Sequence, residues 1–250
     1  MNSKYYQEYF VLEREHWWFK ARMKILETQV RKVIENQNGS GLKILNVGVA
    51  TGATSQMLSK FGSVTSVEYD SDCCKFLREN LKMEVKEASF TDLPFGSGEY
   101  DLVCAFDVIE HIKDDERAVS EAQRVLKKKG NFIFTVPAYN FLWSSHDVIN
   151  HHYRRYTKSS FDTLLKSSEK LELSFSSYFN FWLFLPIASF RAFNKLQKKS
   201  DDVKSDFEKF KGNNLINRLL YSLFLTENAL LKHWISFPFG VSYLTFGKKL

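Results

Sequence analysis

The stretch ILNVGVATG, residues 44–52, places an apolar run directly before a turn that contains Gly48 and Gly52. The run predicts a buried strand, and the glycines predict a tight turn that a ligand can approach closely, because glycine has no side chain. In open α/β sheets, ligands bind at the carboxyl ends of the strands. The stretch therefore predicts an α/β fold with a ligand at this turn.

Strand and helix patterns alternate along most of the chain, in the order typical of a parallel, doubly wound sheet. The expected strands are 43–48, 64–68, 83–87, 101–106, 131–136, 171–178 and 241–247. The expected helices are 5–35, 53–61, 72–81, 115–128 and 158–169. We therefore expect an α/β fold with a doubly wound, mostly parallel, seven-stranded sheet behind an N-terminal helix.

Composition and charge narrow the classes of function. Residues 180–250 contain 11 Lys or Arg and 5 Asp or Glu, so this stretch carries the whole formal charge of +6. Residues 1–179 are neutral on balance, and we expect no nucleic-acid partner. The three cysteines include an adjacent pair, and the N-terminus has no signal-peptide pattern. Both features favour the reducing cytoplasm.

Two classes of ligand use a glycine turn after the first strand. Dinucleotides prefer G-x-G-x-x-G, but Ala50 puts a methyl group where the pyrophosphate needs the closest approach. Adenosyl ligands without a pyrophosphate fit G-x-G-x-G, in which Gly48 and Gly52 take the outer positions and Ala50 is a small substitute. Glu68 can hold ribose hydroxyls in either class, so the glycine spacing favours an adenosyl ligand without deciding the matter.

Three acidic residues fall at the carboxyl ends of expected strands. Glu68 ends the second strand, and Asp92 follows the third, where it can accept the amino group of an adenine. Asp107 ends the fourth strand and leads into Glu110 and His111. Parallel strands bring these ends to one edge of the sheet, so we expect the acids to share one ligand site.

Five motifs in this order resemble the class I S-adenosylmethionine-dependent methyltransferases. They are ILNVGVATG 44–52, VEYD 67–70, SFTDLPF 89–95, DLVCAFDVIEHI 101–112 and VLKKKGNFIFTVP 125–137. The resemblance covers roughly residues 40–178 and the final strand. It implies a Rossmann-like methyltransferase fold, S-adenosylmethionine as the cofactor, and methyl transfer as the reaction. Segments 13–22, 136–157 and 237–249 also resemble a bacterial subgroup often encoded beside sugar- and lipid-modifying enzymes.

The resemblance also implies a set of cofactor-binding residues. They are Asn46, Gly48, Ala50, Gly52, Glu68, Tyr69, Asp92, Leu93, Asp107 and His111. Two of them depart from the family pattern, since Asn46 stands where the family usually has an acid and Ala50 where it has the middle glycine. Asn46 can still bind the ligand's amino group but supplies no charge, so we expect weaker cofactor binding.

The loop SHDVINHHYRRYT, residues 145–157, follows the fifth strand and so lies over the expected pocket. A hydroxyl acceptor needs a general base, whereas a carboxylate acceptor needs none. We expect His146 or His152 to be the base, and Arg154 or Arg155 to hold a phosphate or carboxylate. Tyr153 completes the candidate catalytic set. The alternative is a structural loop, whose Arg and Tyr side chains pair with acids of the core.

Asp107, Glu110 and His111 are spaced i, i+3 and i+4, so they share one face if the segment is helical. A divalent ion is one candidate ligand for this face. In this fold, such residues more often border the methionine end of the cofactor or the acceptor. The sequence has no zinc-type cluster, and we expect no metal.

We divide the chain into an N-terminal helical extension (1–40), a cofactor-binding core (41–179), a helical insertion (180–237) and the last core strand (238–250). Neighbouring Trp17 and Trp18 cannot share a helix face, so at least one should be buried. The extension is then either a lid over the cofactor or a helix packed on the sheet.

The insertion interleaves apolar and aromatic residues with Arg191, Lys195, Arg218 and Lys232, as an interfacial amphipathic helix requires. Its longest strongly apolar run is too short to span a bilayer. We consider peripheral contact with the inner membrane surface, favoured by the positive charge, against a helical subdomain whose aromatics are buried or form a dimer contact. The sequence does not determine the oligomeric state.

The sequence favours a methyltransferase that acts at oxygen on a small-molecule, glycan or lipid-linked acceptor. One alternative is a nicotinamide-dependent oxidoreductase or epimerase, which Ala50 and the lack of a Tyr-x-x-x-Lys pair disfavour. Another is a non-catalytic adenosyl-binding domain, for which Asn46 and Ala50 are the only hints.

Overall fold

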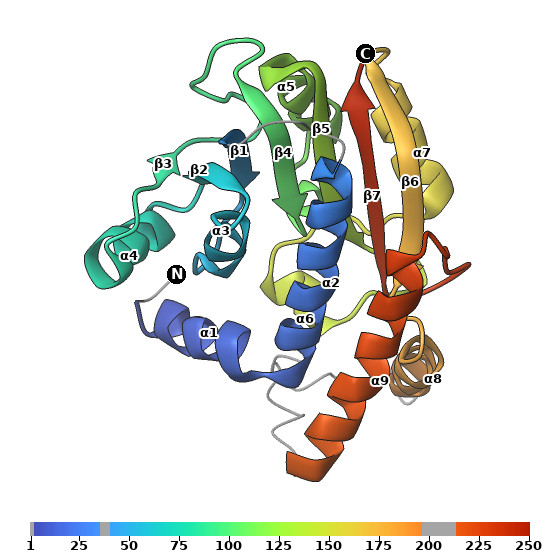
Figure 1. Ribbon diagram of the computed structural model, residues 1–250. Coiled ribbons are helices and arrows are strands. Elements are labelled where there is room, and N and C mark those ends of the chain that lie inside the picture. Colours follow the sequence, from blue (N-terminus) through green and yellow to red (C-terminus); the bar gives the residue numbers. More distant parts are fainter. Residues whose placement is uncertain (1–2, 36–40, 197–213) are drawn as a thin grey trace.

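A computed structural model describes residues 3–35, 41–196 and 214–250 (Figure 1). The strands are β1 (Leu42–Val47), β2 (Gly62–Glu68), β3 (Lys86–Glu87), β4 (Tyr100–Phe106), β5 (Leu126–Pro137), β6 (Leu171–Phe179) and β7 (Ser242–Lys249). The α-helices are α1 (Ser3–Glu15), α2 (Trp17–Ile34), α3 (Ala53–Leu58), α4 (Ser71–Leu81), α5 (Asp115–Val125), α6 (Ser145–Ile149), α7 (Lys158–Lys166), α8 (Phe184–Leu196) and α9 (Asn214–Lys232). Two 3-10 turns are η1 (Ile109–His111) and η2 (Asn140–Leu142).

The seven strands form one sheet in the order β3-β2-β1-β4-β5-β7-β6. β7 runs antiparallel to β5 and β6, and the other neighbouring strands are parallel. The strand order changes direction between β1 and β4, and in open α/β sheets ligands bind in the crevice at such a switch point. The doubly wound, mostly parallel fold expected from the sequence is confirmed.

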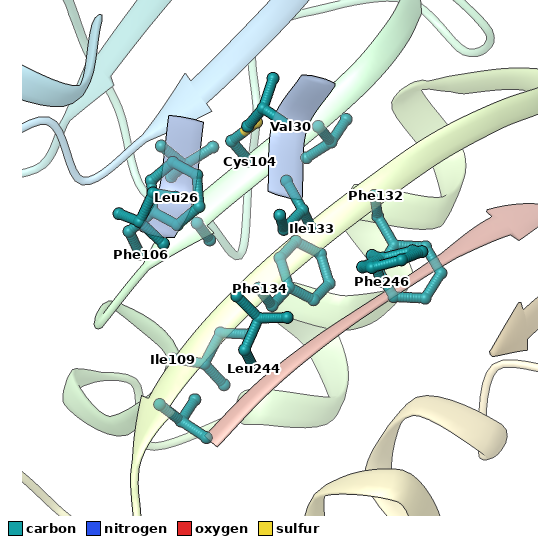
Figure 2. Packing of buried hydrophobic residues seen from close by; sticks show 14 of the residues in the cluster. Leu26, Val30, Cys104, Phe106, Ile109, Phe132, Ile133, Phe134, Leu244 and Phe246 are labelled. Atoms are coloured by element: carbon teal, nitrogen blue, oxygen red, sulfur yellow. The ribbon is translucent and has the colours of Figure 1, made fainter. Parts of the chain in front are cut away.

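Helices cover both faces of the sheet, with α2 and α9 in front and α5 and α7 behind it in Figure 1. The central strand β4 is therefore buried along nearly its whole length, as expected for a parallel strand covered on both faces. Figure 2 shows Leu26 and Val30 of α2 beside Cys104 of β4 and Ile133 of β5, and all four belong to one buried cluster. This packing fixes α2 across the sheet.

The single helix expected over residues 5–35 is wrong, because the chain turns at His16. The His16 backbone is extended, with ψ 133°, and its side chain accepts a hydrogen bond from the Trp18 amide at 3.2 Å. This bond caps the first turn of α2 and separates it from α1. Trp17 is 8% exposed, which confirms that at least one tryptophan of the pair is buried.

The helix expected over residues 115–128 ends earlier, at Val125. Leu126 is fully buried and pairs with Tyr100, so β5 begins there and includes the KKKG segment at 127–130. Lys129 takes a positive φ of 63°, which lets the strand continue past an irregularity in pairing. Burial of Leu126 thus outweighed the helix-end pattern of the lysines and glycine.

The insertion between β6 and β7 forms α8 and α9, and α9 packs along α2 (Figure 1). The buried Lys32 amine donates to the Leu231 carbonyl at 2.8 Å and lies 3.7 Å from the Trp234 ring centroid. Burial lowers the pKa of Lys32 to about 8. One face of α9 is therefore part of the core. Within the described residues, no helix combines the length and hydropathy needed to cross a membrane.

Candidate active site

The glycine turn after β1 has two positions at which the backbone favours glycine. Gly48 and Gly52 have φ values of +69° and +83°, in the left-handed region that favours glycine. A Cβ atom on Gly48 would lie 2.4 Å from Val108 Cγ2, so this turn packs directly on the segment that follows β4. Ala50 also takes a positive φ, of 45°, at the position where the dinucleotide template asks for glycine. The turn thus keeps the conformation of a glycine-rich loop despite the alanine.

Glu68, at the end of β2, is fixed against this turn. Its Oε2 accepts a hydrogen bond from the Ala50 amide at 3.0 Å, and its Oε1 accepts from the amides of Tyr69 and Asp70 at 2.8 and 3.1 Å. Burial raises the pKa of Glu68, and these backbone hydrogen bonds oppose that effect without cancelling it. Each carboxylate oxygen has two lone pairs, and Oε1 uses both, so one lone pair of Oε2 is left for a ligand hydroxyl.

Asn46, in β1, supports the start of α3. Its amide nitrogen donates to Thr54 Oγ1 at 2.8 Å and to Ser55 Oγ at 2.9 Å. The Asn46 side chain is fully buried, and its Oδ1 has no partner among the described residues. A buried acceptor without a donor is costly, so this atom fits an amino group or a water.

Asp107 follows β4 and faces the N-terminal helices. Its carboxylate accepts hydrogen bonds from Arg22 at 2.7 Å and from Thr135 Oγ1 at 2.9 Å. Its backbone has a positive φ of 57°, which turns the chain sharply into η1. The residue expected to bind the cofactor therefore also ties α2 to the sheet.

Helix α1 lies against the glycine turn. Arg14 donates to the Thr51 carbonyl at 3.1 Å, and the Thr51 hydroxyl donates to Glu13. Burial raises the pKa of Glu13, although the Thr51 hydrogen bond and two arginines oppose it. The N-terminal extension thus contacts the site, and its role as a lid stays a prediction.

Three other expected cofactor residues lie in different surroundings. The Tyr69 ring is 76% exposed, whereas Leu93 is buried and its amide donates to Glu121 of α5 at 2.9 Å. Asp92 is exposed and lines a hollow of about 530 Å³ together with Arg124 and Lys249. Asp92 thus faces α5 and the end of β7, and its role toward an adenine stays a prediction.

The loop after β5 folds around a buried ion pair. Asp147 is fully buried, and Arg155 donates to its two carboxylate oxygens at 2.7 and 2.9 Å. His152 Nδ1 lies 2.8 Å from Asp147 Oδ1. Burial raises the pKa of Asp147, but the hydrogen bonds from His152 and Arg155 outweigh this and hold the pKa below its usual range. Asp147 therefore orients His152.

Of the other catalytic candidates in this loop, Arg154 makes a structural ion pair and Tyr153 is exposed at the surface. Arg154 pairs with Asp115 at 2.6 Å and donates to the Lys113 carbonyl, as the structural alternative anticipated. Tyr153 is 57% exposed, and His146 has its ring 6.1 Å from that of His152. The structure thus gives both arginines carboxylate partners, and a role for Arg154 in binding an acceptor stays a prediction.

His152 also meets His111 and Glu110, which follow β4. The two imidazole rings lie edge to face, with centroids 4.4 Å apart. His111 is exposed at the surface, but the protein packed around its ring, followed by the nearby His152, lowers the pKa of His111 to about 4. Burial, followed by the Asp107 charge, raises the pKa of Glu110 well above its usual range. Sequence spacing suggested Glu110 with His111 but gave no signal that His152 joins them.

Comparison with known proteins gives a consistent picture. Residues 45–134 match the family described as a methyltransferase domain. The sarcosine/dimethylglycine N-methyltransferase of Halorhodospira halochloris is 33% identical over 113 residues, which are 42% of this chain and 40% of that protein. The phosphatidylethanolamine N-methyltransferase of Cereibacter sphaeroides is 26% identical over 117 residues, covering 44% of this chain and 58% of that protein. The chain thus spans less than two thirds of either relative.

Among solved structures, a SAM-dependent methyltransferase from Archaeoglobus fulgidus aligns with a TM-score of 0.56 and 15% identity. The alignment covers 96% of this chain and 99% of that one. At this identity the likeness shows the fold alone.

Proposed function

We infer that this chain, a class I S-adenosylmethionine-dependent methyltransferase by its domain and its relatives, methylates an acceptor that reaches the loop after β5. The observation that carries the proposal is the contact of Glu68 with Ala50 at the turn after β1. This contact holds a carboxylate beside a glycine-rich turn at the switch point of the sheet, and Ala50 stands where the dinucleotide template has the glycine that lets a pyrophosphate approach.

The residues of the turn fit the proposed cofactor. Glu68 would accept a ribose hydroxyl at Oε2, and the unpartnered Oδ1 of Asn46 fits a donor such as the amino group of the methionine part. Helix α1, through Arg14 and Glu13, would shield the turn from water. Bound there, S-adenosylmethionine supplies a methyl group made electrophilic by its sulfonium.

We assign the acceptor side to His152. Its Nδ1 is held by Asp147, so its orientation is fixed and its Nε2 is left to act on an acceptor. The neighbouring Val108 packs on Gly48, which connects the segment of Glu110 and His111 to the cofactor turn. A hydroxyl acceptor fits this side best, because removal of its proton needs such a group.

The acceptor class that we propose is a lipid or lipid-linked molecule at an anionic surface. Helices α8 and α9 expose large apolar side chains between 37% and 70%: Leu185, Phe190, Phe193, Ile216, Leu219 and Leu223. The apolar surface continues to the loop after β5, where the exposed Phe141 of η2 contacts Phe184 of α8, with ring centroids 6.1 Å apart. The positive charge of residues 180–250 favours anionic headgroups.

An amine is the second candidate acceptor, because both curated relatives compared above carry the name of N-methyltransferases, one of them acting on phosphatidylethanolamine. An amine acceptor would need only a neutral nitrogen, and His152 would then take up the proton released after transfer.

Calorimetric titration with S-adenosylmethionine and with NAD tests the cofactor, and binding of NAD alone would overturn the proposal. Transfer of labelled methyl groups to vesicles then tests the acceptor. Phosphatidylglycerol offers hydroxyls and phosphatidylethanolamine an amine, so label in the first supports the hydroxyl reading and label in the second the amine reading. Labelled methyl transfer to water-soluble extract alone would contradict the lipid proposal.

Co-sedimentation with anionic vesicles tests the surface itself. The double variant Phe190→Ser and Phe193→Ser should lose binding, whereas Val11→Ser, which removes a similarly exposed apolar side chain of α1, should keep it. If native protein does not co-sediment with anionic vesicles, α8 and α9 do not bind a membrane.

A further inference from the structure

Glu110, His111 and His152 bring three metal-ligating groups together beside the glycine turn. One ligand atom from each residue lies within 4.8 Å of the others. The first two residues belong to η1 after β4, and the third comes from the loop after β5. One carboxylate and two imidazoles form a donor set that divalent transition-metal ions take in proteins.

The buried carboxylate of Glu110 is the feature that points to a bound cation. Its side chain is fully buried, and neither carboxylate oxygen has a hydrogen-bond partner among the described residues. The two nearby arginines pair with other carboxylates: Arg22 is bonded to Asp107, and Arg155 is bonded to Asp147. A buried carboxylate without a partner is strongly unfavourable, and protonation would still leave an unpaired hydroxyl. A cation bound at Glu110 removes this cost.

His152 is already oriented as a metal-bound histidine usually is. Its Nδ1 bonds to Asp147 Oδ1, so one nitrogen fixes the ring and the other is left for the cluster. Such outer hydrogen bonds to a carboxylate or a backbone carbonyl are typical of metal-bound histidine.

We propose that Glu110, His111 and His152 bind one divalent transition-metal ion. This departs from the absence of a metal expected from the sequence. Metal binding is inferred from the positions of these three residues alone, whereas a role of the ion in catalysis rests on the proposed methyl transfer. With the ion bound, His152 Nε2 is a metal ligand and no longer a free base. The ion, with three protein ligands, would then keep a position for an acceptor oxygen, orient a hydroxyl there and lower its pKa.

Cobalt(II) is a suitable probe, because ligand-field absorption in the visible range reports its coordination. Protein stripped with a chelator should bind one Co²⁺ per chain with a visible spectrum. Glu110→Gln keeps the shape of the side chain, and His152→Ala removes a ligand. Each should weaken Co²⁺ binding by at least about 100-fold, the upper end of the loss seen for outer-shell partners. His233→Ala, which removes an exposed histidine after α9, should bind as native protein does.

Thermal unfolding separates a metal site from a merely structural cluster. Without metal, Glu110→Gln should be at least as stable as native protein, because it removes a buried unpaired carboxylate. With Co²⁺, native protein should gain in Tm and the variant should not. The proposal fails if native protein binds no stoichiometric Co²⁺, or if both variants bind it with native affinity. These measurements need no S-adenosylmethionine, so they stand apart from the test of the methyltransferase activity.

Discussion

Arg22 of α2 donates a hydrogen bond to Asp107 Oδ2 at 2.7 Å, although 85 residues separate the two in the sequence. Arg22 is almost fully buried, while the Asp107 side chain is 31% exposed. The pair joins the N-terminal extension to the end of β4, where the candidate site lies. Stability of the extension and order in the site are therefore coupled.

Arg22→Met should lower the free energy of unfolding by about 2 kcal/mol, less than for a fully buried pair because Asp107 reaches solvent. Urea unfolding measures this change. Arg31→Met on the same helix removes an exposed arginine 3.7 Å from Glu27, and we expect at most about 0.5 kcal/mol there. An equal loss of unfolding free energy in the two variants would mean that the Arg22–Asp107 pair stabilises the fold no more than an exposed ion pair does.

Glu68→Ala should weaken S-adenosylmethionine binding by roughly 1.5–3 kcal/mol, as expected for a hydrogen bond to a charged group. The variant also removes the acceptor of the Ala50 amide, which loosens the turn. Calorimetric titration measures the affinity. Glu87→Ala is the control, because it removes an exposed acid from the neighbouring strand β3. Native affinity in Glu68→Ala would remove Glu68 from the cofactor site.

Gly48→Ala should destabilise the fold for two separable reasons. The new Cβ would clash with Val108 Cγ2, and alanine is unfavourable at a φ of +69°. The second change Val108→Ala removes the clash but not the backbone strain. In thermal unfolding, the double variant should therefore recover part of the Tm lost by Gly48→Ala alone. No recovery would show that backbone strain alone sets the cost.

His152→Ala should lower methyl transfer at least tenfold while S-adenosylmethionine binding stays near native. The reason is that we assign His152 to the acceptor side, and Asp147 keeps Arg155 as its partner without it. His151→Asn is the matched control, since His151 is exposed and asparagine tolerates its positive φ of 56°. Full turnover in His152→Ala would leave the loop with a structural role only.

Glu227 of α9 makes stability depend on pH. It is fully buried and accepts a hydrogen bond from the Trp182 amide at 3.2 Å, and burial raises its pKa from 4.5 to about 7. The folded state therefore holds a proton that the unfolded state has lost, so stability falls as pH rises from about 4.5 to about 7.

Glu227→Gln should remove this fall and be more stable than native protein at pH 8, by up to about 3 kcal/mol. Denaturant unfolding across the pH range measures the difference. Glu172→Gln changes a half-exposed acid of β6 and should leave the pH profile as it is. A Glu227→Gln profile parallel to the native one would contradict the raised pKa.

The sequence by itself determined the sheet and the glycine turn after β1. Alternating strand and helix patterns are local properties of the chain, and the positions of Gly48, Gly52 and Glu68 at strand ends follow from that order. The resemblance to class I methyltransferases rests on these same local motifs. Local patterns failed at His16 and Leu126, where a side-chain cap and burial overrode the helix signal.

Only the tertiary structure decided which distant side chains share a site. His152 meets Glu110 and His111 because β5 lies beside β4, and Arg22 meets Asp107 because α2 crosses the sheet. The tertiary structure also decided which arginines pair with carboxylates of the protein. Arg155 is bonded to the buried Asp147, although the sequence predicted that it could hold a phosphate or carboxylate of the ligand. Pairing of charges and donors depends on distance in space, and the spacing of residues along a chain does not contain that distance.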